Sequence, residues 1–397
     1  MSMTTAEKTS ILPILLLSAA GFTVLTTEFV IVGLLPSMAR DLHVSVSQAG
    51  LLVTLFAFTV AVVGPALTAW LSRYDRKSLF VSTLLFFGIS NILAATAPNI
   101  GIMGFARFIP ALMLPVFWAL ASETAVDITG PERAGKAISM ISFGIVTATI
   151  FGIPVGTLIS DAFGWRAAFA SIAVLAFIKA IALMLFLPKV PLKKQPASFL
   201  KQFGILKNPV VVGHVLLSLL VFAGMFTAYT YLADILERLA GFDGATVGWI
   251  LMGFGGVGMI GNWFAGRIVD RSPLGATILF AAPMAVGMIL LVSIVRSHAL
   301  LGVVLAFWGI AQAALFTISH VRVMKVAAET PALGASLNIS GANAGIGIGA
   351  IIGGRVIDIN GLDHVGGAAA GVMLLAVAVA FFLKLGTKPK LGHRVTA

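Results

Sequence analysis

Two charged residues, Glu28 and Arg107, lie within long apolar stretches of the sequence and are its best candidates for chemistry. A charged side chain at membrane depth costs at least ~2.5–3.5 kcal/mol, so it is a functional candidate by default. Burial favours a neutral Glu28 carboxyl, whereas a nearby Arg107 favours the charged form. A carboxyl balanced between these effects can take up and release a proton. The alternative is a permanent ion pair that joins two helices.

The predicted depths of the two residues permit a contact. With Pro36 as the end of the first helix, Glu28 lies about 12 Å below that end, at 1.5 Å per residue. Arg107 lies about 9 Å from Gly101 on the same side. Two other charges lie near helix interiors: we interpret Glu123 as an interface residue and Lys179 as a side chain whose stem extends to the surface.

The elements that position these residues are apolar helices. The chain has 397 residues, of which 59% are hydrophobic and 10% charged, against roughly 25% charged in globular proteins. A spanning helix needs about 20 apolar residues. The predicted fold class is therefore all-α, a polytopic membrane protein of twelve transmembrane helices. We expect them near 11–35, 48–71, 78–97, 101–126, 137–160, 167–187, 209–233, 245–268, 274–296, 300–322, 333–358 and 365–386.

The sequence divides into two similar halves. The longest polar break, 188–208, predicts a linker between six-helix bundles at 1–187 and 209–397. Residues of the first half recur in order in the second: Ser139, Gly144, Gly152, Gly156 and Asp161 recur 197 positions later, and Ala20, Gly21 and Thr27 recur 203 positions later as Ala223, Gly224 and Thr230. An even number of helices per half makes the repeats parallel.

The distribution of positive charge predicts the orientation. The formal net charge is +11, and the predicted helices leave only Arg40, Arg166, Arg238, Arg296 and Arg355 on one side, with most other lysines and arginines opposite. Because positive residues collect on the cytoplasmic side, we expect both termini and the linker there, in the cell inner (plasma) membrane. The basic excess thus reflects topology, and we expect no nucleic acid partner. The N-terminus carries no cleavable signal pattern, so the first helix should be retained.

Enzymatic and metal chemistry find no support in the motifs. Without cysteine, disulfides, thiolate zinc sites and iron–sulfur clusters are excluded. The histidines lack metal-binding spacing, and no nucleophile is paired with a base. Gly253, Gly255 and Gly258 form G-x-G-x-x-G, but within an apolar helix and without a preceding strand. We therefore expect no enzyme, no metal and no cofactor, with a proton gradient as the energy source.

Four segments carry a resemblance to a known family: TTEFVIVGLLP (26–36), FGWRAAF (163–169), AYTYLADIL (228–236) and RVMKVAAETPALGASLNISGANAGIGIGA (322–350). With them, nearly the whole chain resembles the major facilitator superfamily, and within it the twelve-helix drug:proton antiporters of the arabinose-efflux and sugar-efflux permease type. The fourth-helix motif R-x-x-x-G keeps Arg107 but has Ala111 for the glycine. The fifth-helix motif G-P-x-x-G-G is matched loosely by Gly152, Pro154 and Gly156.

The resemblance implies roles for further residues. The loop signature G-x-x-x-D-R is complete in the second half, whereas the first half lacks its Gly and Asp. The implied gating residues are Arg73, Asp75, Arg76, Gly266, Asp270 and Arg271. The substrate-contact candidates, which can equally be packing residues, are Thr27, Phe117, Tyr229, Tyr231, Gln312, Asn338 and Asn343. Small residues let helices approach closely, and the candidates for such packing, or for sliding faces, are Gly144, Gly152, Pro154, Gly156, Gly341, Gly345, Gly349 and Gly353.

The expected function is secondary active transport by alternating access. We expect efflux of a small organic compound, such as a drug or a sugar, in exchange for protons, by a monomer in the lipid bilayer. Proton-coupled uptake and uncoupled facilitation of a sugar or nucleoside are alternatives within the same fold. A non-transporting membrane sensor is a remote alternative, because a sensor would be expected to append a soluble signalling domain.

Overall fold

The computed structural model describes residues 11–130, 134–189, 205, 207–328 and 331–386. These ranges contain helices and no strand. The first half comprises α1 (Leu12–Asp41), α2 (Val46–Leu71), α3 (Arg76–Ala95), α4 (Ile100–Thr129), α5 (Ala134–Thr147), the π-helical turn η2 (Ala148–Gly152), α6 (Ile153–Phe163) and α7 (Trp165–Phe186). Most of the predicted linker lies outside the described residues.

The second half follows the same order. It comprises α9 (Pro209–Tyr229), α10 (Leu232–Arg238), α11 (Gly244–Ile268), α12 (Pro273–Ile294), α13 (His298–Val326), α14 (Pro331–Asn360), the short 3-10 helix η4 (Leu362–His364) and α15 (Val365–Gly386). Within the described ranges, twelve helical spans are long and apolar enough to cross a membrane. The all-α fold class with twelve spans is thus confirmed.

The helices begin and end at local signals. Ser45 and Gln48 form a capping box at the start of α2, which satisfies two of the helix's free N–H groups. The Asn99 side chain accepts a 3.0 Å hydrogen bond from the Ile102 amide at the start of α4. Gly164 separates α6 from α7 with a φ of 84°, a conformation that glycine adopts without strain.

Two departures from the predicted helices lie close to the interface between the halves. The first helix continues through Pro36 to Asp41, because a proline inside a membrane helix removes one hydrogen bond without ending the helix when neighbouring helices enclose it. Pro36 is itself buried. The seventh spanning helix is interrupted at Thr230 and Tyr231, so that it consists of α9 and the short α10.

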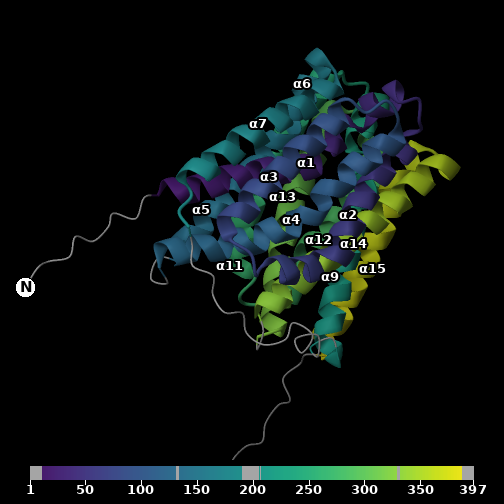
Figure 1. The fold of residues 1–397 in the computed structure, drawn as a ribbon. Coiled ribbons are helices and arrows are strands. Elements are labelled where there is room, and N and C mark those ends of the chain that lie inside the picture. The colour runs from purple at the N-terminus through teal and green to yellow at the C-terminus, as the bar shows by residue number, and fades with distance from the viewer. Residues whose placement is uncertain (1–10, 131–133, 190–204, 206, 329–330, 387–397) are drawn as a thin grey trace, which may run out of the picture.

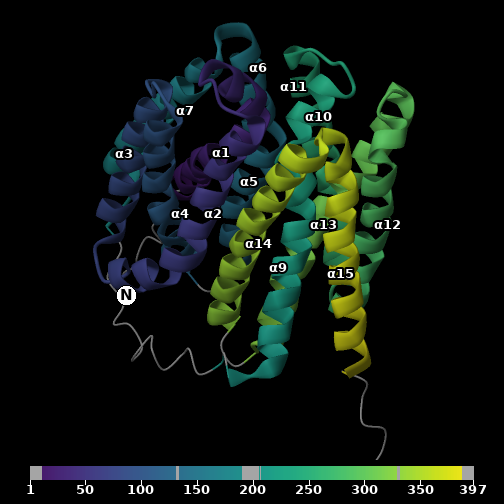
Figure 2. The ribbon, with the colours of Figure 1, turned by 90° about the vertical axis from the view of Figure 1, so that its right-hand side faces the viewer.

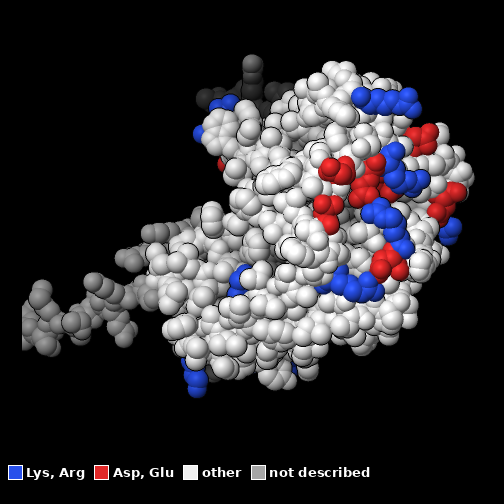
Figure 3. Space-filling view, turned by 90° about the horizontal axis from the view of Figure 1, so that it is seen from above, with Lys and Arg blue, Asp and Glu red and all other residues white. Residues whose placement is uncertain are grey.

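The two halves stand side by side (Figures 1 and 2). The first residue of α1 and the last of α15 lie at one end, here called the proximal end. The opposite end, here called the distal end, carries the connections 42–45, 239–243 and 361. Figure 3, seen from above, shows acidic and basic side chains together over part of the distal end and wide areas without either. Many large hydrophobic side chains are exposed, among them Phe163, Trp249 and Phe382, which suits a protein whose solvent is lipid.

The predicted packing glycines lie within each half. A Cβ on Gly144, Gly152 or Gly156 would meet α1, and one on Gly341, Gly345, Gly349 or Gly353 would meet α9 or Tyr231. Pro154 is the second residue of α6, which directly follows η2. The repeats therefore use the same contact, in which the fifth spanning helix packs closely on the first and the eleventh on the seventh. These glycines do not form the interface between the halves.

Candidate transport site

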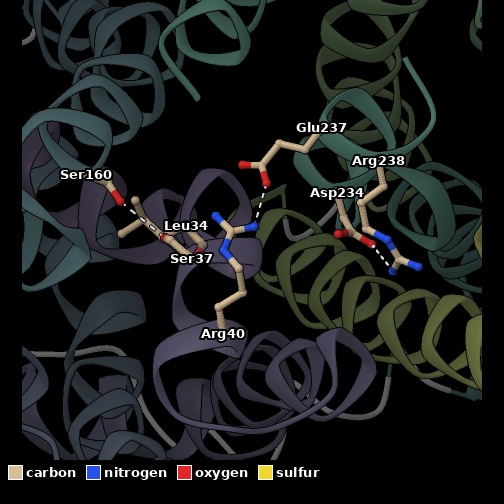
Figure 4. A network of polar contacts seen from close by, with 7 residues as sticks. All are labelled: Leu34, Ser37, Arg40, Ser160, Asp234, Glu237 and Arg238. Carbon is tan, nitrogen blue, oxygen red and sulfur yellow. Dashed lines mark hydrogen bonds and ion pairs between the residues drawn. The ribbon is translucent and has the colours of Figure 1, made fainter. Parts of the chain in front are cut away.

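The two halves meet through polar contacts near the distal end. Arg40 of α1 forms an ion pair with Glu237 of α10 at 2.8 Å (Figure 4). The Ser47 hydroxyl of α2 donates a 2.6 Å hydrogen bond to Asp358 of α14. The Thr54 hydroxyl donates to the backbone carbonyl of Gly347 at 3.2 Å. Together these contacts hold the distal end closed.

Tyr231 takes part in this closure. Its hydroxyl donates a 2.7 Å hydrogen bond to the backbone carbonyl of Ala350. The ring occupies space left by glycines, since a Cβ on Gly50 of α2 or Gly354 of α14 would collide with its hydroxyl. The side chain is 1% exposed.

Glycines of α11 form a second contact between the halves. A Cβ on Gly244 would meet Asp161, one on Gly248 would meet Leu158, and one on Gly255 would meet the backbone of η2. Gly255 is the middle glycine of the G-x-G-x-x-G sequence. These glycines thus allow a close approach of two helices, which their spacing alone could not predict, because glycine spacing does not say which neighbour a helix faces.

Arg107 and Glu28 come together, but not as an ion pair. Arg107 donates from one terminal nitrogen to the backbone carbonyl of Thr27 and from the other to that of Glu28, at 2.7 Å for the latter. Its guanidinium also lies over the Phe56 ring, 4.5 Å from the centroid. Among the described residues, no hydrogen bond or ion pair involves the Glu28 carboxyl group. The arginine therefore fixes the backbone of α1 and leaves this carboxyl without a partner.

The Glu28 side chain lines a small cavity between the halves. The residues around it are Glu28, Phe29, Val32, Val53, Phe56, Ala57, Arg107 and Ile346, of which Ile346 belongs to the second half. The predicted contact at similar depth is present, but Pro36 is not the end of the first helix. Because α1 ends at Asp41, Glu28 lies about 20 Å from its end, whereas Arg107 lies about 10 Å from the start of α4. Their contact forms because α1 extends further than α4.

A row of polar groups continues from Arg107 along α1. The Asn91 amide donates to the Thr27 hydroxyl at 3.2 Å, and that hydroxyl donates to the Thr23 carbonyl at 2.9 Å. The Lys179 ammonium donates to the Thr23 hydroxyl at 2.5 Å and lies 5.0 Å from the Phe22 ring centroid. The expectation that Lys179 extends to the surface was therefore wrong. Asn91 was missed, although it is the single amide side chain of the third helix.

Aromatic side chains of the second half lie opposite. The aromatic cluster consists of Phe222, Phe226 and Tyr229 of α9, Phe254 of α11, and Trp308 and Phe316 of α13. Phe29 of α1 contacts it across the interface, with its centroid 5.9 Å from that of Phe226. The Trp308 indole donates a 3.0 Å hydrogen bond to Gln312. The first half thus contributes polar groups to the centre, and the second half contributes aromatic rings.

The remaining substrate-contact candidates lie elsewhere. Phe117 is 1% exposed in the core of the first half, against Phe80 and Trp118. Asn338 accepts a 2.8 Å hydrogen bond from Ser218, and Asn343 donates to a carbonyl of its own helix. The structure therefore brings Thr27, Tyr229 and Gln312 toward the centre, and it engages Phe117 and Asn338 within single halves.

The residues predicted to gate make contacts within their own halves at the proximal end. Arg76 pairs with Glu123 at 2.8 Å, and Asp270 pairs with Lys325 at 2.6 Å. Asp75 accepts 2.8 Å hydrogen bonds from the Ser78 amide and hydroxyl. These bonds lower the pKa of Asp75 below its ordinary value, with the Ser78 amide as the largest cause and burial opposing it. The other three residues predicted to gate are exposed; they are Arg73, Gly266 and Arg271.

Comparison with known proteins gives the family. Residues 17–338 match the model described as Major Facilitator Superfamily. The uncharacterized MFS-type transporter YtbD of Bacillus subtilis (strain 168) is 33% identical over 369 residues, covering 91% of this chain and 92% of the relative. The inner membrane transport protein YdhP of Escherichia coli (strain K12) is 32% identical over 370 residues, covering 92% and 95%.

Solved structures share the fold. A bacterial homologue of the human lysosomal transporter Spinster, in an inward-facing and unoccupied conformation, matches with a TM-score of 0.76, 17% identity and coverage of 96% of this chain and 98% of that one. A D-xylose–proton symporter matches with a TM-score of 0.74, 17% identity and coverage of 94% and 97%.

Proposed function

The chain belongs to the major facilitator superfamily, and from this premise we propose that it exports a small organic compound in exchange for protons, by alternating access. It is a multi-pass membrane transporter and not an enzyme. The observation that carries the proposal is the position of Glu28. Its carboxyl lines the cavity between the halves and, among the described residues, has no ion-pair partner.

Coupling needs a group whose protonation differs between the two conformations. In the distal-closed conformation, apolar side chains such as Val53, Ala57 and Ile346 surround the Glu28 carboxyl. Such a lining solvates a neutral acid better than a carboxylate, whereas water admitted by opening solvates the carboxylate. Arg107 does not neutralise the group by direct contact, since it binds backbone carbonyls. The carboxyl can therefore exchange its proton as the halves move.

The substrate is proposed to bind between the polar row of α1 and the aromatic cluster. Thr27 and Asn91 offer hydrogen-bonding groups on one side, and the rings of Phe226 and Tyr229 offer an apolar surface on the other. The contact of Phe29 with Phe226 joins the two sides. This arrangement suits a compound with an apolar ring and at least one polar group.

The direction of transport is part of the proposal. If the predicted charge asymmetry sets the topology, the proximal end is cytoplasmic, and the distal closure makes this an inward-facing conformation in a monomer. Proton-coupled uptake is the competing direction, because a D-xylose–proton symporter has the same fold. Export and uptake are distinguished by the sign of the pH gradient that drives accumulation in vesicles.

The test uses Glu28→Gln in vesicles with an imposed pH gradient. The amide mimics the protonated acid, so the variant should fold and exchange substrate in the absence of a gradient. It should lose accumulation against a concentration gradient. Asp363→Asn, at an exposed carboxylate of the distal end, is the matched control and should transport normally. Undiminished accumulation by Glu28→Gln would eliminate the proposal.

A further inference from the structure

Arg322 is fully buried near the proximal end of the second half. It lies at the last position of the predicted tenth helix, 300–322, but the structure continues this helix as α13 to Val326 and leaves 0% of Arg322 exposed. Its terminal nitrogens donate to the Thr277 hydroxyl at 2.9 Å, the Ser218 hydroxyl at 2.8 Å and the His214 carbonyl at 3.3 Å. These three acceptors come from α12 and α9, so Arg322 joins three helices.

Within the described part of the chain, Arg322 has no counter-charge. All three of its acceptors are neutral, and among the described residues no carboxylate pairs with it. Its Nε atom and both ring nitrogens of His214 are buried without a hydrogen-bond partner. His214 is 3% exposed, and even a neutral imidazole carries one N–H donor. The cluster therefore combines an uncompensated positive charge with unused donors, an arrangement that is costly unless something negative completes it.

The first half shows what is missing. At its proximal end, Arg76 at the start of α3 is 5% exposed and pairs with Glu123 near the end of α4 at 2.8 Å. Thr277 follows Arg76 by 201 positions, and Arg322 follows Glu123 by 199, close to the spacings of the sequence repeat. The same junction of two helices thus has a base and an acid in the first half, whereas its described residues in the second half supply only a base.

We propose that Arg322, Ser218, Thr277 and His214 form a binding site for a small monovalent anion such as chloride, separate from the central cavity. The anion would supply the negative charge that Glu123 supplies in the first half. The burial of the cluster requires a ligand of about the size of a halide. Thr277 and Arg322 each lie about 6 Å, or one turn, from the proximal ends of their helices, so the route from the proximal solvent is short.

The test measures thermal unfolding of the purified protein in detergent, with chloride or gluconate at equal ionic strength. A ligand that binds only the native state raises Tm in a saturable way, so chloride and bromide should each raise Tm relative to gluconate. Arg322→Gln should abolish the rise. Equal Tm values in all three salts, or a full chloride response in folded Arg322→Gln, would overturn the proposal.

In a second variant, the carboxylate of a side chain takes the place of the bound anion. Thr277→Asp places a carboxylate where the hydroxyl now accepts from Arg322 at 2.9 Å. Its Tm in gluconate should reach that of the unmodified protein in chloride, and chloride should raise it no further. Thr277→Val, which removes the hydroxyl without adding charge, should not raise Tm in gluconate. A chloride response in Thr277→Asp as large as in the unmodified protein would show that the anion binds elsewhere. These measurements do not depend on transport or on Glu28.

Discussion

The Arg40 guanidinium of α1 donates a 2.8 Å hydrogen bond to the Glu237 carboxylate of α10, and this ion pair joins the two halves at the distal end (Figure 4). The side chains are 65% and 19% exposed, and exposed pairs contribute roughly 0.2–1 kcal/mol. Glu237→Gln should therefore increase the population of the distal-open conformation by up to about fivefold.

Because the sequence contains no cysteine, the labelling rate of a single introduced cysteine can measure opening of the distal end. A cysteine in place of Ser37, which lies against Ser160 at 3.2 Å, should react faster with a membrane-impermeant maleimide when the distal end opens. Arg238→Gln is the control, because Arg238 pairs with Asp234 within one helix and should leave the labelling rate unchanged. Equal rates in Glu237→Gln and the unmodified background would show that the ion pair does not bias the conformations.

Gly255 and the adjacent Gly256 give a matched pair for the second contact between the halves. A Cβ on Gly255 would lie 2.5 Å from the Thr149 carbonyl oxygen, whereas one on Gly256 has no neighbour within 4 Å. Gly255→Ala should impair distal closure and slow transport while each half stays folded. Gly256→Ala should be neutral or slightly stabilising, since alanine favours helix by about 1 kcal/mol over glycine. Transport rates and Tm of both variants test this, and equal behaviour would argue against a close α11–η2 contact.

Protonation of Asp75 at acidic pH should lower the stability of the folded protein. Hydrogen bonds from Ser78 lower its folded pKa, so its contribution is fully present above the unfolded value of about 4 and is lost as the pH falls through the lowered folded value. Asparagine also caps helices. Asp75→Asn should therefore remove this part of the pH dependence of Tm, whereas Asp75→Ala should cost about 0.5–2 kcal/mol at neutral pH. Identical Tm–pH curves for Asp75→Asn and the unmodified protein would contradict this.

The predicted topology can be tested with reporter fusions. Fusions after Lys194 and after Lys390 should report the cytoplasm, because the basic residues gather toward the ends of the chain and the linker. A fusion after Asp243, in a distal connection, should report the opposite side. The same compartment for the fusions at 194 and 243 would refute the orientation or the helix count.

Length and hydropathy were sufficient to predict the helical spans, since crossing a bilayer demands both. They could not predict where helices continue beyond the apolar region or break within it. Pro36 was read as the end of the first helix, and the interruption at Tyr231 was read as continuous helix. Both depend on neighbouring helices that supply packing and hydrogen bonds, which a local sequence window does not contain.

The candidate site was predictable in part for a related reason. A buried carboxylate such as Glu28 is conspicuous in an apolar stretch, and so is Arg107. Their geometry was not predictable, because Arg107 binds backbone carbonyls, which every residue has. Asn91 and Arg322 were missed since a single amide, or an arginine near a helix end, looks the same in the sequence whether it is buried or solvated.

The interruption of the seventh helix also bears on how the two halves came to differ. The glycine contacts match Ser18, Thr26 and Val30 of α1 with Val215, Ala223 and Thr227 of α9, each 197 positions later. The same spacing relates Glu28 to Met225 and Leu34 to Tyr231. The carboxyl thus lies on an unbroken helix of one half, whereas the phenol lies at the helix break of the other. Present-day halves are therefore not interchangeable, and a chimera built from two copies of either one would lack one of the two side chains.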